Sequence, residues 1–332
     1  MNRKEIYEKV YGCLIGLSVG DALGAPTEGM TLEGIREKYN WVDGFFSDDP
    51  VGTDDTEYSM LTSLILLKYG ENLTYRDMTN EWSKYLLDQN GGFKGGGFSE
   101  VDAIFNLRKG LVAPYSGMDN HEMWSDGVAM RIAPVGVYFA GDPEKAAKIA
   151  EIEARISHDR DGVYCGMAIA ASVAYAMTGD SWEKVIQNGL DVLPKDSWSY
   201  RKISEAVNIG MKYSNVQEAM EELYNKVSIF YYPWADVAPE ATALAYGVFA
   251  ASKGDYKQAV LGGTNIGRDS DTIASMNGAL TGALNGASVI PEDWKSRINV
   301  IKGVCVKKTK GIDIRDLSEK FTDVIVGRGI NE

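Results

Sequence analysis

The sequence predicts an all-α fold in a single compact domain, because three observations agree. Apolar residues recur every three to four positions along most of the chain, which is the period of an amphipathic helix. Segments with strand character are few, and the best one, residues 227–232, fits a buried extended segment equally well. No linker, low-complexity tract or solenoid-length repeat divides the 332 residues. We therefore expect one helical domain over residues 1–332.

The helical period places the expected helices in order along the chain. Asp142 stands before Pro143, so a capping residue precedes a proline at the first helical position. Pro291 begins another helix, and Glu292 places an acid in its first turn, where the helix dipole favours negative charge. Residues 303–332 carry no recognisable motif, and their role stays open. The expected helices cover residues 3–19, 54–68, 75–88, 99–109, 127–139, 143–156, 162–177, 182–193, 197–213, 216–227, 239–251, 256–261, 271–285 and 291–301.

The composition excludes several classes of protein. Hydrophobic residues make up 45% of the chain, which is ample for a buried core and argues against disorder. The net charge of −13 argues against binding nucleic acid through a broad basic surface. Glu5, Glu8 and Asp21 interrupt the N-terminal segment, and no uncharged apolar run is long enough to span a bilayer. We expect a soluble protein with neither a nucleic-acid nor a membrane partner.

The cysteines and histidines restrict the compartment and the metal chemistry. Cys13, Cys165 and Cys305 lack metal-type spacing and cannot all pair with one another, which fits a reducing cytosol. His121 and His158 are the only histidines. We therefore expect a cytoplasmic protein without a histidine-rich metal site.

Two short acidic clusters lie far apart in the chain, at residues 53–56 (TDDT) and 269–272 (DSDT), each at the start of an expected helix. Carboxylate and hydroxyl oxygens suit Mg²⁺, Mn²⁺ or Ca²⁺ and do not suit Zn²⁺ or copper. If the fold brings the clusters together, four aspartates converge, and their charge needs a metal to offset it. The alternative is that Asp and Thr only cap two helices. Two matching clusters favour a metal site over two caps.

Glycines recur every fourth residue within 12–20 and again within 278–286. A glycine costs a helix about 1 kcal/mol relative to alanine, so these stripes need a reason, and close approach of two backbones supplies one. We expect the two stripes to mark the innermost helices. The first ends at Gly20-Asp21 and the second begins at Asp271, so close packing would bring acidic ends together.

Six segments, ordered from about Tyr11 to Trp294, resemble the ADP-ribosylglycohydrolase family. Any one of them is a weak signal, whereas six in the family's order are a strong one. They are residues 12–28 (GCLIGLSVGDALGAPTE), 52–56 (GTDDT), 91–98 (GGFKGGGF), 124–134 (WSDGVAMRIAP), 157–162 (SHDRDG) and 267–286 (GRDSDTIASMNGALTGALNG).

The resemblance implies an orthogonal all-α fold with two Mg²⁺ (or Mn²⁺) ions. Family members cleave the bond between C1″ of ADP-ribose and an acceptor such as an arginine guanidinium or a serine oxygen. The substrate would then be an ADP-ribosylated protein or a small-molecule riboside, and the oligomeric state stays open. Carried over residue by residue, the metal ligands are Thr53, Asp54, Asp55, Asp269, Asp271 and Thr272.

Three carboxylates are candidates for the proton transfer. Two metal ions can orient the ribose and lower the pKa of a bound water, and a carboxylate beside that water can take its proton. Among the metal ligands, we expect Asp55 or Asp271 to take this proton. Glu28 matches the glutamate of the family's first motif, and its alternative is a surface or capping glutamate. Asp21 either bonds loop backbone or supports the metal ligands, and we favour the supporting role.

Further residues match substrate-contacting positions of the family. The glycine-rich loop would offer backbone N–H groups to a diphosphate, its alternative being a mobile surface loop. The alternative for Trp124 is a core residue that does not contact substrate. The alternative for His158 is a hydrogen-bonded surface residue. Arg131 fits a structural ion pair. The expected substrate-binding residues are Gly95, Gly96, Gly97, Trp124, Ser125, Asp126, Gly127 and His158.

Two positions depart from the family pattern. Asp126 stands where asparagine is common, and Arg268 stands where glycine is common, directly before Asp269. Asp126 adds negative charge where a substrate hydroxyl or phosphate is expected, and a cationic leaving group would complement it. We therefore expect an active hydrolase whose acceptor or riboside differs from ADP-ribosyl-arginine. The alternatives are a hydrolase of another riboside, such as a nucleoside, and a non-catalytic ADP-ribose-binding or structural relative.

Overall fold

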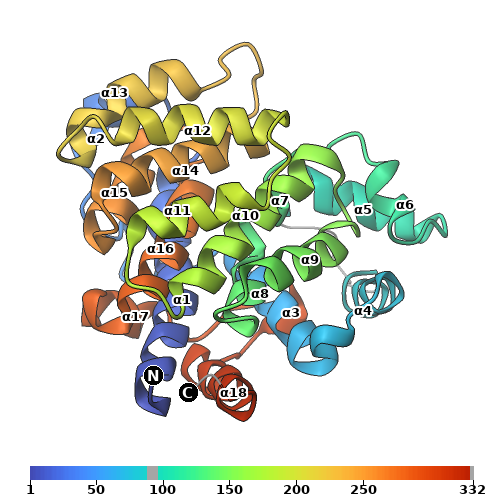
Figure 1. Ribbon diagram of the computed structural model, residues 1–332. Coiled ribbons are helices and arrows are strands. Elements are labelled where there is room, and N and C mark those ends of the chain that lie inside the picture. Colours follow the sequence, from blue (N-terminus) through green and yellow to red (C-terminus); the bar gives the residue numbers. More distant parts are fainter. Residues whose placement is uncertain (88–95, 330–332) are drawn as a thin grey trace.

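The computed structural model describes residues 1–87 and 96–329, and it confirms the all-α prediction. In this part of the chain there are eighteen α-helices and no strand (Figure 1), and only two isolated β-bridges occur. The helices are α1 (Arg3–Gly24), α2 (Leu32–Tyr39), α3 (Asp54–Tyr69), α4 (Tyr75–Leu86), α5 (Phe98–Arg108), α6 (Tyr115–Met118), α7 (Gly127–Arg131), α8 (Ala133–Tyr138), α9 (Pro143–Ala154), α10 (Arg160–Ala176), α11 (Trp182–Asp191), α12 (Trp198–Gly210), α13 (Val216–Val227), α14 (Ala238–Ser252), α15 (Tyr256–Ile266), α16 (Ser270–Asn285), α17 (Glu292–Ile298) and α18 (Ile314–Gly327).

Helices α1 and α16 form the centre of the domain, as the glycine stripes predict. Both are buried on all sides over most of their length, and they run antiparallel in direct contact. A Cβ built on Gly12 would lie 2.6 Å from the carbonyl carbon of Gly286, and one on Gly20 would lie 2.7 Å from the amide nitrogen of Ser275. A side chain at these positions would therefore push the two backbones apart.

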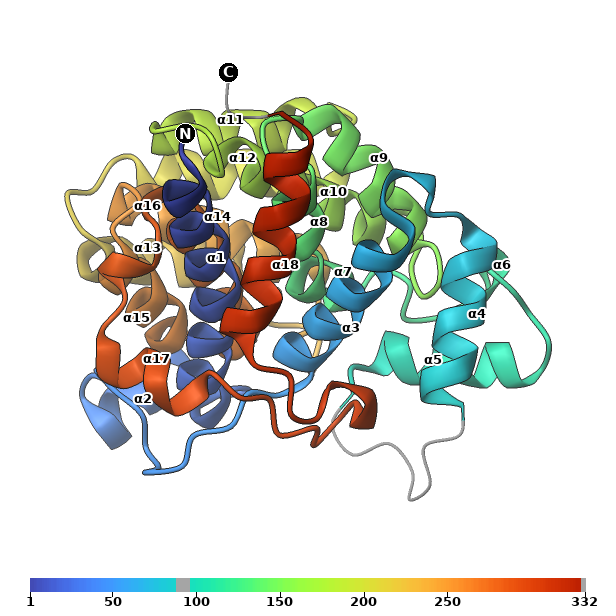
Figure 2. The same ribbon diagram turned by 90° about the horizontal axis from the view of Figure 1, so that it is seen from below.

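The other helices surround this pair. Helix α15 packs on α16, helices α10 and α14 pack against it as well, and α12 covers α14 from outside (Figure 1). On another side of α1 lies α18 (Figure 2). None of the helices in the described ranges has both the length and the apolar character needed to cross a bilayer.

Helix α18 and the segment before it belong to the packed structure, although residues 303–332 carry no recognisable motif. Ile314, Leu317, Phe321 and Ile325 form its buried face, and this spacing is that of an amphipathic helix. The preceding loop is held by Glu57 of α3, whose carboxylate accepts hydrogen bonds from three consecutive backbone N–H groups, at residues 304–306, at 2.6–2.7 Å. The C-terminal segment thus supports the helix that carries the first acidic cluster.

One segment that the sequence left open is resolved, and one prediction about local structure was wrong. Residues 228–232 do not form a strand, because the amide of Ile229 donates to the side chain of Glu240, at 2.6 Å, and not to a neighbouring strand. The expected helix over 127–139 is two helices, α7 and α8, which meet at Ile132. Pro134 lacks an N–H and its ring clashes with the preceding turn, so the helix cannot continue through it. Helices α2, α6 and α18 were not predicted.

We predict that Gly278→Ala destabilises the protein by about 3 kcal/mol or more. Its Cβ would lie 2.5 Å from the carbonyl carbon of Gly16, and a backbone atom cannot rotate away as a side chain can. Denaturant unfolding measures the change. Gly327→Ala, near the end of α18, is the matched control, because a Cβ there meets nothing within 4 Å. Equal stability of the two variants would contradict close backbone contact as the reason for the stripe.

Candidate functional site

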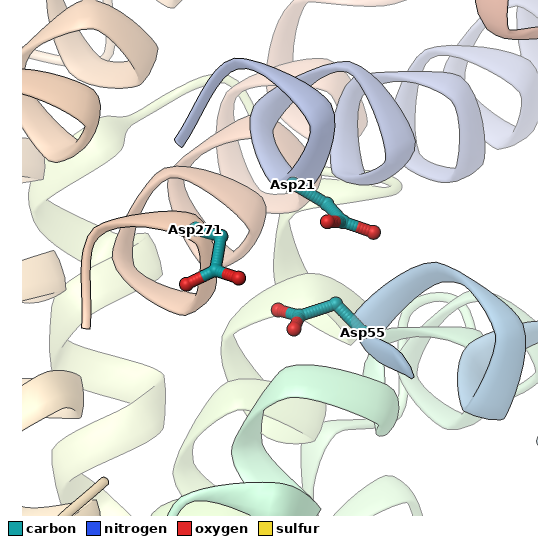
Figure 3. Close-up of side chains that lie close together, drawn as sticks. All are labelled: Asp21, Asp55 and Asp271. Atoms are coloured by element: carbon teal, nitrogen blue, oxygen red, sulfur yellow. The ribbon is translucent and has the colours of Figure 1, made fainter. Parts of the chain in front are cut away.

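Three helix ends meet at one point and bring their acidic residues together. Asp21 lies near the C-terminal end of α1, Asp55 in the first turn of α3 and Asp271 in the first turn of α16. Figure 3 shows the three carboxylates pointing toward one another, and each offers an oxygen within 4.8 Å of the others. Glu28, Asp269 and Asp271 form a second such group, so Asp271 belongs to both.

Asp21 is fixed by the start of α3. Its carboxylate accepts hydrogen bonds from the backbone N–H of Thr53 at 2.7 Å and of Thr56 at 3.1 Å, and from both threonine hydroxyls at 2.8 and 2.5 Å. Asp21 thus caps α3 from another helix, satisfying N–H groups that have no partner within α3. Asp21 thus bonds backbone, the first of the two roles expected of it, and these bonds set the position of Asp55. The favoured role, support of the metal ligands, stays a prediction.

Several buried carboxylate oxygens in this region have no hydrogen-bond partner within the described residues. Oδ1 of Asp55, Oδ1 of Asp271 and Oδ2 of Asp126 are among them. A buried polar atom almost always has a partner, and an acceptor-only oxygen needs a donor or a cation. The hydroxyl of Thr272 lies 3.5 Å from Oδ2 of Asp55. These oxygens fit a hard divalent cation, so the donor set agrees with the metal that the sequence predicts.

The electrostatics of the site also favour a bound cation. Burial, followed by the charges of neighbouring carboxylates, raises the pKa of Asp55 and of Asp271 well above the usual range. Glu28 keeps contact with solvent, yet partial desolvation and the charge of Asp269 raise its pKa to about 7. Burial raises the pKa of Asp21 to about 6, against the effect of its four hydrogen bonds. A divalent ion among these groups would stabilise the ionised forms.

A cavity of about 320 Å³ opens over the acidic residues. All the predicted metal ligands line it, together with Glu28 and with five predicted substrate-binding residues: Gly96, Gly97, Ser125, Asp126 and Gly127. Neither lysine nor arginine is among the described lining residues, which leaves the cavity strongly negative. The predicted residue Gly95 lies outside the described residues.

Trp124 and His158 do not line this cavity. Trp124 packs edge-on against Tyr232, with ring centroids 5.1 Å apart. His158 is fully buried behind Ser125, with Nε2 3.1 Å from the Ser125 hydroxyl and Nδ1 2.7 Å from the hydroxyl of Ser157. Burial lowers the pKa of His158 well below its usual value, so the ring is neutral. Through these bonds His158 positions Ser125 at the cavity wall.

A buried ion-pair network supports the wall formed by residues 125–127. Arg131 is fully buried and bonds Glu100, Glu153 at 2.8 Å and the Ser157 hydroxyl at 2.8 Å, as the predicted ion-pair role requires. Glu100 lies directly under Gly127, where an added Cβ would be 2.6 Å from a carboxylate oxygen. Because glycine has no Cβ, the backbone at residue 127 can lie against the carboxylate of Glu100 without a steric clash.

Sequence reasoning missed Asp236, which also lines the cavity. It lies between α13 and α14, and the amide of Asp126 donates to its backbone carbonyl at 3.0 Å. A single aspartate in the segment WADVAP (234–239) has no pattern that marks it as functional. Only the pairing of Ser125 with Val237, an isolated β-bridge, brings it to the site.

Arg268 directs its charge away from the acidic cluster. Its φ is +60°, and its side chain bonds Glu240 at 2.5 Å and the carbonyl oxygen of Trp234 at 3.2 Å. Its backbone bonds Gly29 at 2.8 Å and Met30 at 2.9 Å, which fixes the loop that carries Glu28. The departure from glycine at this position thus joins two loops at the edge of the cavity.

Comparison with known proteins agrees with this arrangement. The model of one protein family, ADP-ribosylglycohydrolase, matches residues 2–329. The chain belongs to the ADP-ribosylglycohydrolase family. This confirms the resemblance that the six segments carry, and membership in the ADP-ribosylglycohydrolase family implies a hydrolase of ADP-ribosyl bonds.

Relatives within the ADP-ribosylglycohydrolase family match over most of their length. An uncharacterized protein of Archaeoglobus fulgidus is 32% identical over 86% of this chain and 90% of its own. The ADP-ribosyl-[dinitrogen reductase] glycohydrolase of Rhodospirillum rubrum is 24% identical over 90% and 93%. The ADP-ribosylhydrolase ARH3 of Mus musculus is 23% identical over 86% and 85%.

A solved structure, described as an ADP-ribosylglycohydrolase-related protein complex, shares the fold. It superposes with a TM-score of 0.69 and 20% sequence identity over 97% of this chain and 99% of its own. The likeness confirms the all-α domain of the ADP-ribosylglycohydrolase family.

We predict that stability depends on divalent ions more strongly as the pH rises. The folded pKa values of Asp21 (about 6) and Glu28 (about 7) lie above the unfolded values of about 4. The contribution of these two carboxyl groups to the free energy of unfolding is therefore full at acidic pH and is lost as the pH rises through the folded pKa values. Mg²⁺ would bind the ionised forms and would raise the free energy of unfolding by about 2.7 kcal/mol at a hundredfold excess over Kd.

Thermal unfolding with Mg²⁺ or with chelator, from about pH 5 to about pH 8, tests this. The difference in Tm should widen toward the upper end and should shrink in Asp271→Asn. A difference that does not change with pH, or that persists in the variant, would contradict a metal site at these carboxylates.

We predict that Arg131→Met lowers the free energy of unfolding by about 3–5 kcal/mol, because it leaves the buried carboxylates of Glu100 and Glu153 without a counterion. Arg36→Met is the matched control. That arginine lies 3.7 Å from Glu221 on the surface, and exposed ion pairs contribute about 0–1 kcal/mol. Urea unfolding compares the two, and a similar small loss for both would show that the network does not stabilise the fold.

Proposed function

We propose that this chain is a metal-dependent hydrolase that cleaves the C1″ N- or O-glycosidic bond of an ADP-ribosylated substrate, with two Mg²⁺ (or Mn²⁺) ions as cofactors. The observation that carries the proposal is the pair of carboxylate groups, Asp21/Asp55/Asp271 and Glu28/Asp269/Asp271, that share one residue and face one cavity. Each group would hold one ion, and Asp271 would contribute to both. The unpartnered buried oxygens of Asp55 and Asp271 support the same conclusion.

The ions would supply a bound water of lowered pKa and would hold the ribose hydroxyls. The proposed ligands are Thr53, Asp54, Asp55, Asp269, Asp271 and Thr272, and Asp21 holds Asp55 in place. Asp55 and Asp271 remain candidates to take the proton of the water. Glu28 is suited to exchange a proton with substrate near neutral pH, since its pKa of about 7 lets both forms exist there.

The cavity is of the size expected for a ribose and the bond to be cleaved, since ligand pockets begin at about 300 Å³. The rest of ADP-ribose would then lie at the mouth, beside the backbone N–H groups of Gly96 and Gly97. Phe98 lies there as well, with its ring 5.1 Å from that of Trp234, and both rings are exposed. An ADP-ribosylated protein and a small-molecule riboside both fit this arrangement.

One observation favours a second candidate, a hydrolase of a riboside without a diphosphate. The described lining residues include no lysine or arginine to pair with a diphosphate. A non-catalytic relative is disfavoured, because converging carboxylates without a metal would destabilise the fold by repulsion. The three cysteines are buried and form no disulfide within the described residues, which fits the cytoplasm as the proposed compartment.

We predict that the protein releases ADP-ribose from an arginine-ADP-ribosylated substrate only with Mg²⁺ or Mn²⁺, and that Asp55→Asn lowers the rate at least about 100-fold, because a catalytic metal supplies several kcal/mol. Mass spectrometry of the released nucleotide is the measurement. Asp43→Asn, at an exposed aspartate outside the cavity, is the control.

Release that survives chelation would contradict the metal-dependent mechanism. Absence of release, together with metal-dependent hydrolysis of a nucleoside, would replace the leading proposal with the second candidate.

A further inference from the structure

The segment between α13 and α14, residues 228–237, forms one edge of the cavity. Near its C-terminal end, the amide of Asp126 donates to the backbone carbonyl of Asp236 at 3.0 Å. Its N-terminal end is held by Glu240, which accepts from the amide of Ile229 at 2.6 Å. The place of Asp236 on this edge, beside residue 126, is therefore determined by the fold.

The acidic side chains of this edge have unsatisfied oxygens. Asp126 is 4% exposed, and its Oδ2 has no hydrogen-bond partner within the described residues. Asp236 is half-buried, and neither of its side-chain oxygens has a partner there. Both residues line the cavity. Because burying an acceptor without a partner costs free energy, these oxygens call for a donor or a cation that the described residues do not supply.

These two residues do not complete an ion site by themselves. In the described ranges, the groups of three or more carboxylates that share a metal-sized space are Asp21/Asp55/Asp271 and Glu28/Asp269/Asp271, and neither includes Asp126 or Asp236. An ion at Asp126 and Asp236 would need further oxygens from water and from a bound molecule. Mg²⁺ is commonly held in this way, by one or two carboxylates, several waters and the phosphates of a substrate.

Asp126 connects this edge to the proposed metal ligands. Its carboxyl group lies within hydrogen-bonding reach of that of Asp269. Two carboxylates in contact repel each other unless a proton or a cation lies between them. A cation held by Asp126 would therefore relieve this repulsion as well as satisfy the open oxygen.

The diphosphate of ADP-ribose would add negative charge to a cavity that is already acidic. Seven carboxyl side chains line the cavity: Glu28, Asp54, Asp55, Asp126, Asp236, Asp269 and Asp271. The two divalent ions of the proposed centre would offset four of these charges, and the described lining residues include neither lysine nor arginine. Arg268 does not offset the remainder, because its guanidinium is engaged by Glu240. Binding of a diphosphate at this edge thus needs a further cation.

The expected place of the diphosphate faces the same edge. The backbone N–H groups of Gly96 and Gly97 are the proposed diphosphate contacts, and Phe98 follows them directly. The ring of Phe98 lies 5.1 Å from that of Trp234, two residues before Asp236. The diphosphate would therefore lie between these N–H groups and the carboxylates of the 228–237 edge.

We propose that Asp126 and Asp236 hold an additional Mg²⁺ ion that enters with the substrate and joins its diphosphate to this edge of the cavity. The two carboxylates and the phosphate oxygens supply ligands, and water completes the coordination. The inference rests on the proposed function and assigns the way in which the diphosphate is recognised. This ion differs from the proposed pair because it binds only together with the ligand.

Counting bound ions tests the proposal without turnover. Mn²⁺ accepts the same oxygen ligands as Mg²⁺. Equilibrium dialysis with metal analysis counts Mn²⁺ on the protein with and without ADP-ribose, and a protein-free compartment corrects for ions on free ADP-ribose. Saturation with ADP-ribose should add one Mn²⁺ per chain, and Asp236→Asn should abolish this addition. Asp43→Asn, at an exposed aspartate outside the cavity, should keep it.

Two outcomes of the count would overturn the proposal. One is that ADP-ribose adds no ion to the parent protein. The other is that Asp236→Asn loses an ion that binds without ADP-ribose, because Asp236 would then belong to the resident metal centre.

The affinity for ADP-ribose distinguishes an ion bridge from simple repulsion by the sign of its change. Calorimetry at saturating Mg²⁺ should give a Kd at least about tenfold higher in Asp126→Asn and in Asp236→Asn, because each removes a charged ligand of the bridging ion. Without a bridge, the same variants would relieve repulsion between carboxylate and diphosphate and would lower Kd. An unchanged or lower Kd in either variant would overturn the proposal.

The two proposals fail in different ways. If ADP-ribose brings an additional ion but no ADP-ribosyl bond is cleaved, the proposed function is wrong and the ion site stands. If ADP-ribosyl bonds are cleaved while ADP-ribose adds no ion, the proposed function stands and the ion site is wrong.

Discussion

The close contact between α1 and α16 is the constraint on which the rest of the structure depends. Glycines face each other along both helices, and a Cβ on Gly24 would lie 2.5 Å from the amide nitrogen of Asp271. This contact fixes the C-terminal end of α1 against the first turn of α16, so Asp21 and Asp271 are neighbours. The residues that carry the chemistry thus take their spacing from backbone contact, which varies less than contact between flexible side chains.

Once these ends are together, electrostatics governs the site. The N-terminal ends of α3 and α16 direct their partial positive charge at the carboxylates, which offsets part of the repulsion. Asp21 gains further stabilisation from four hydrogen bonds, whereas Oδ1 of Asp55 and Oδ1 of Asp271 accept none from the residues that the structure describes. The protein therefore satisfies the acid that positions α3 and leaves oxygens of the proposed ligands open toward the cavity. This division is what a preorganised cation site requires.

Much of this could be predicted from the sequence, and the parts that could not have identifiable causes. The glycine stripes and the acidic clusters are local patterns, so they indicated the central helices and the residues that converge. Residues 227–232 have the composition of a strand, but strand formation depends on a partner, and Glu240 satisfies Ile229 instead. Asp236 has no local pattern at all. It becomes part of the cavity only because the chain on either side of it pairs with residues 124–126.

The two departures from the family pattern act on one structural unit. Arg268, with φ of +60°, bonds Glu240 and the carbonyl oxygens of Ile229 and Trp234, and so holds the segment between α13 and α14, residues 228–237. This segment in turn places Asp236 beside Asp126, the second position expected to depart from the family pattern. A left-handed backbone conformation raises the free energy of a residue with a side chain. The hydrogen bonds of Arg268 must therefore stabilise the fold by more than this strain. Arg268 therefore helps to hold the segment that brings Asp236 to the same side of the cavity as Asp126.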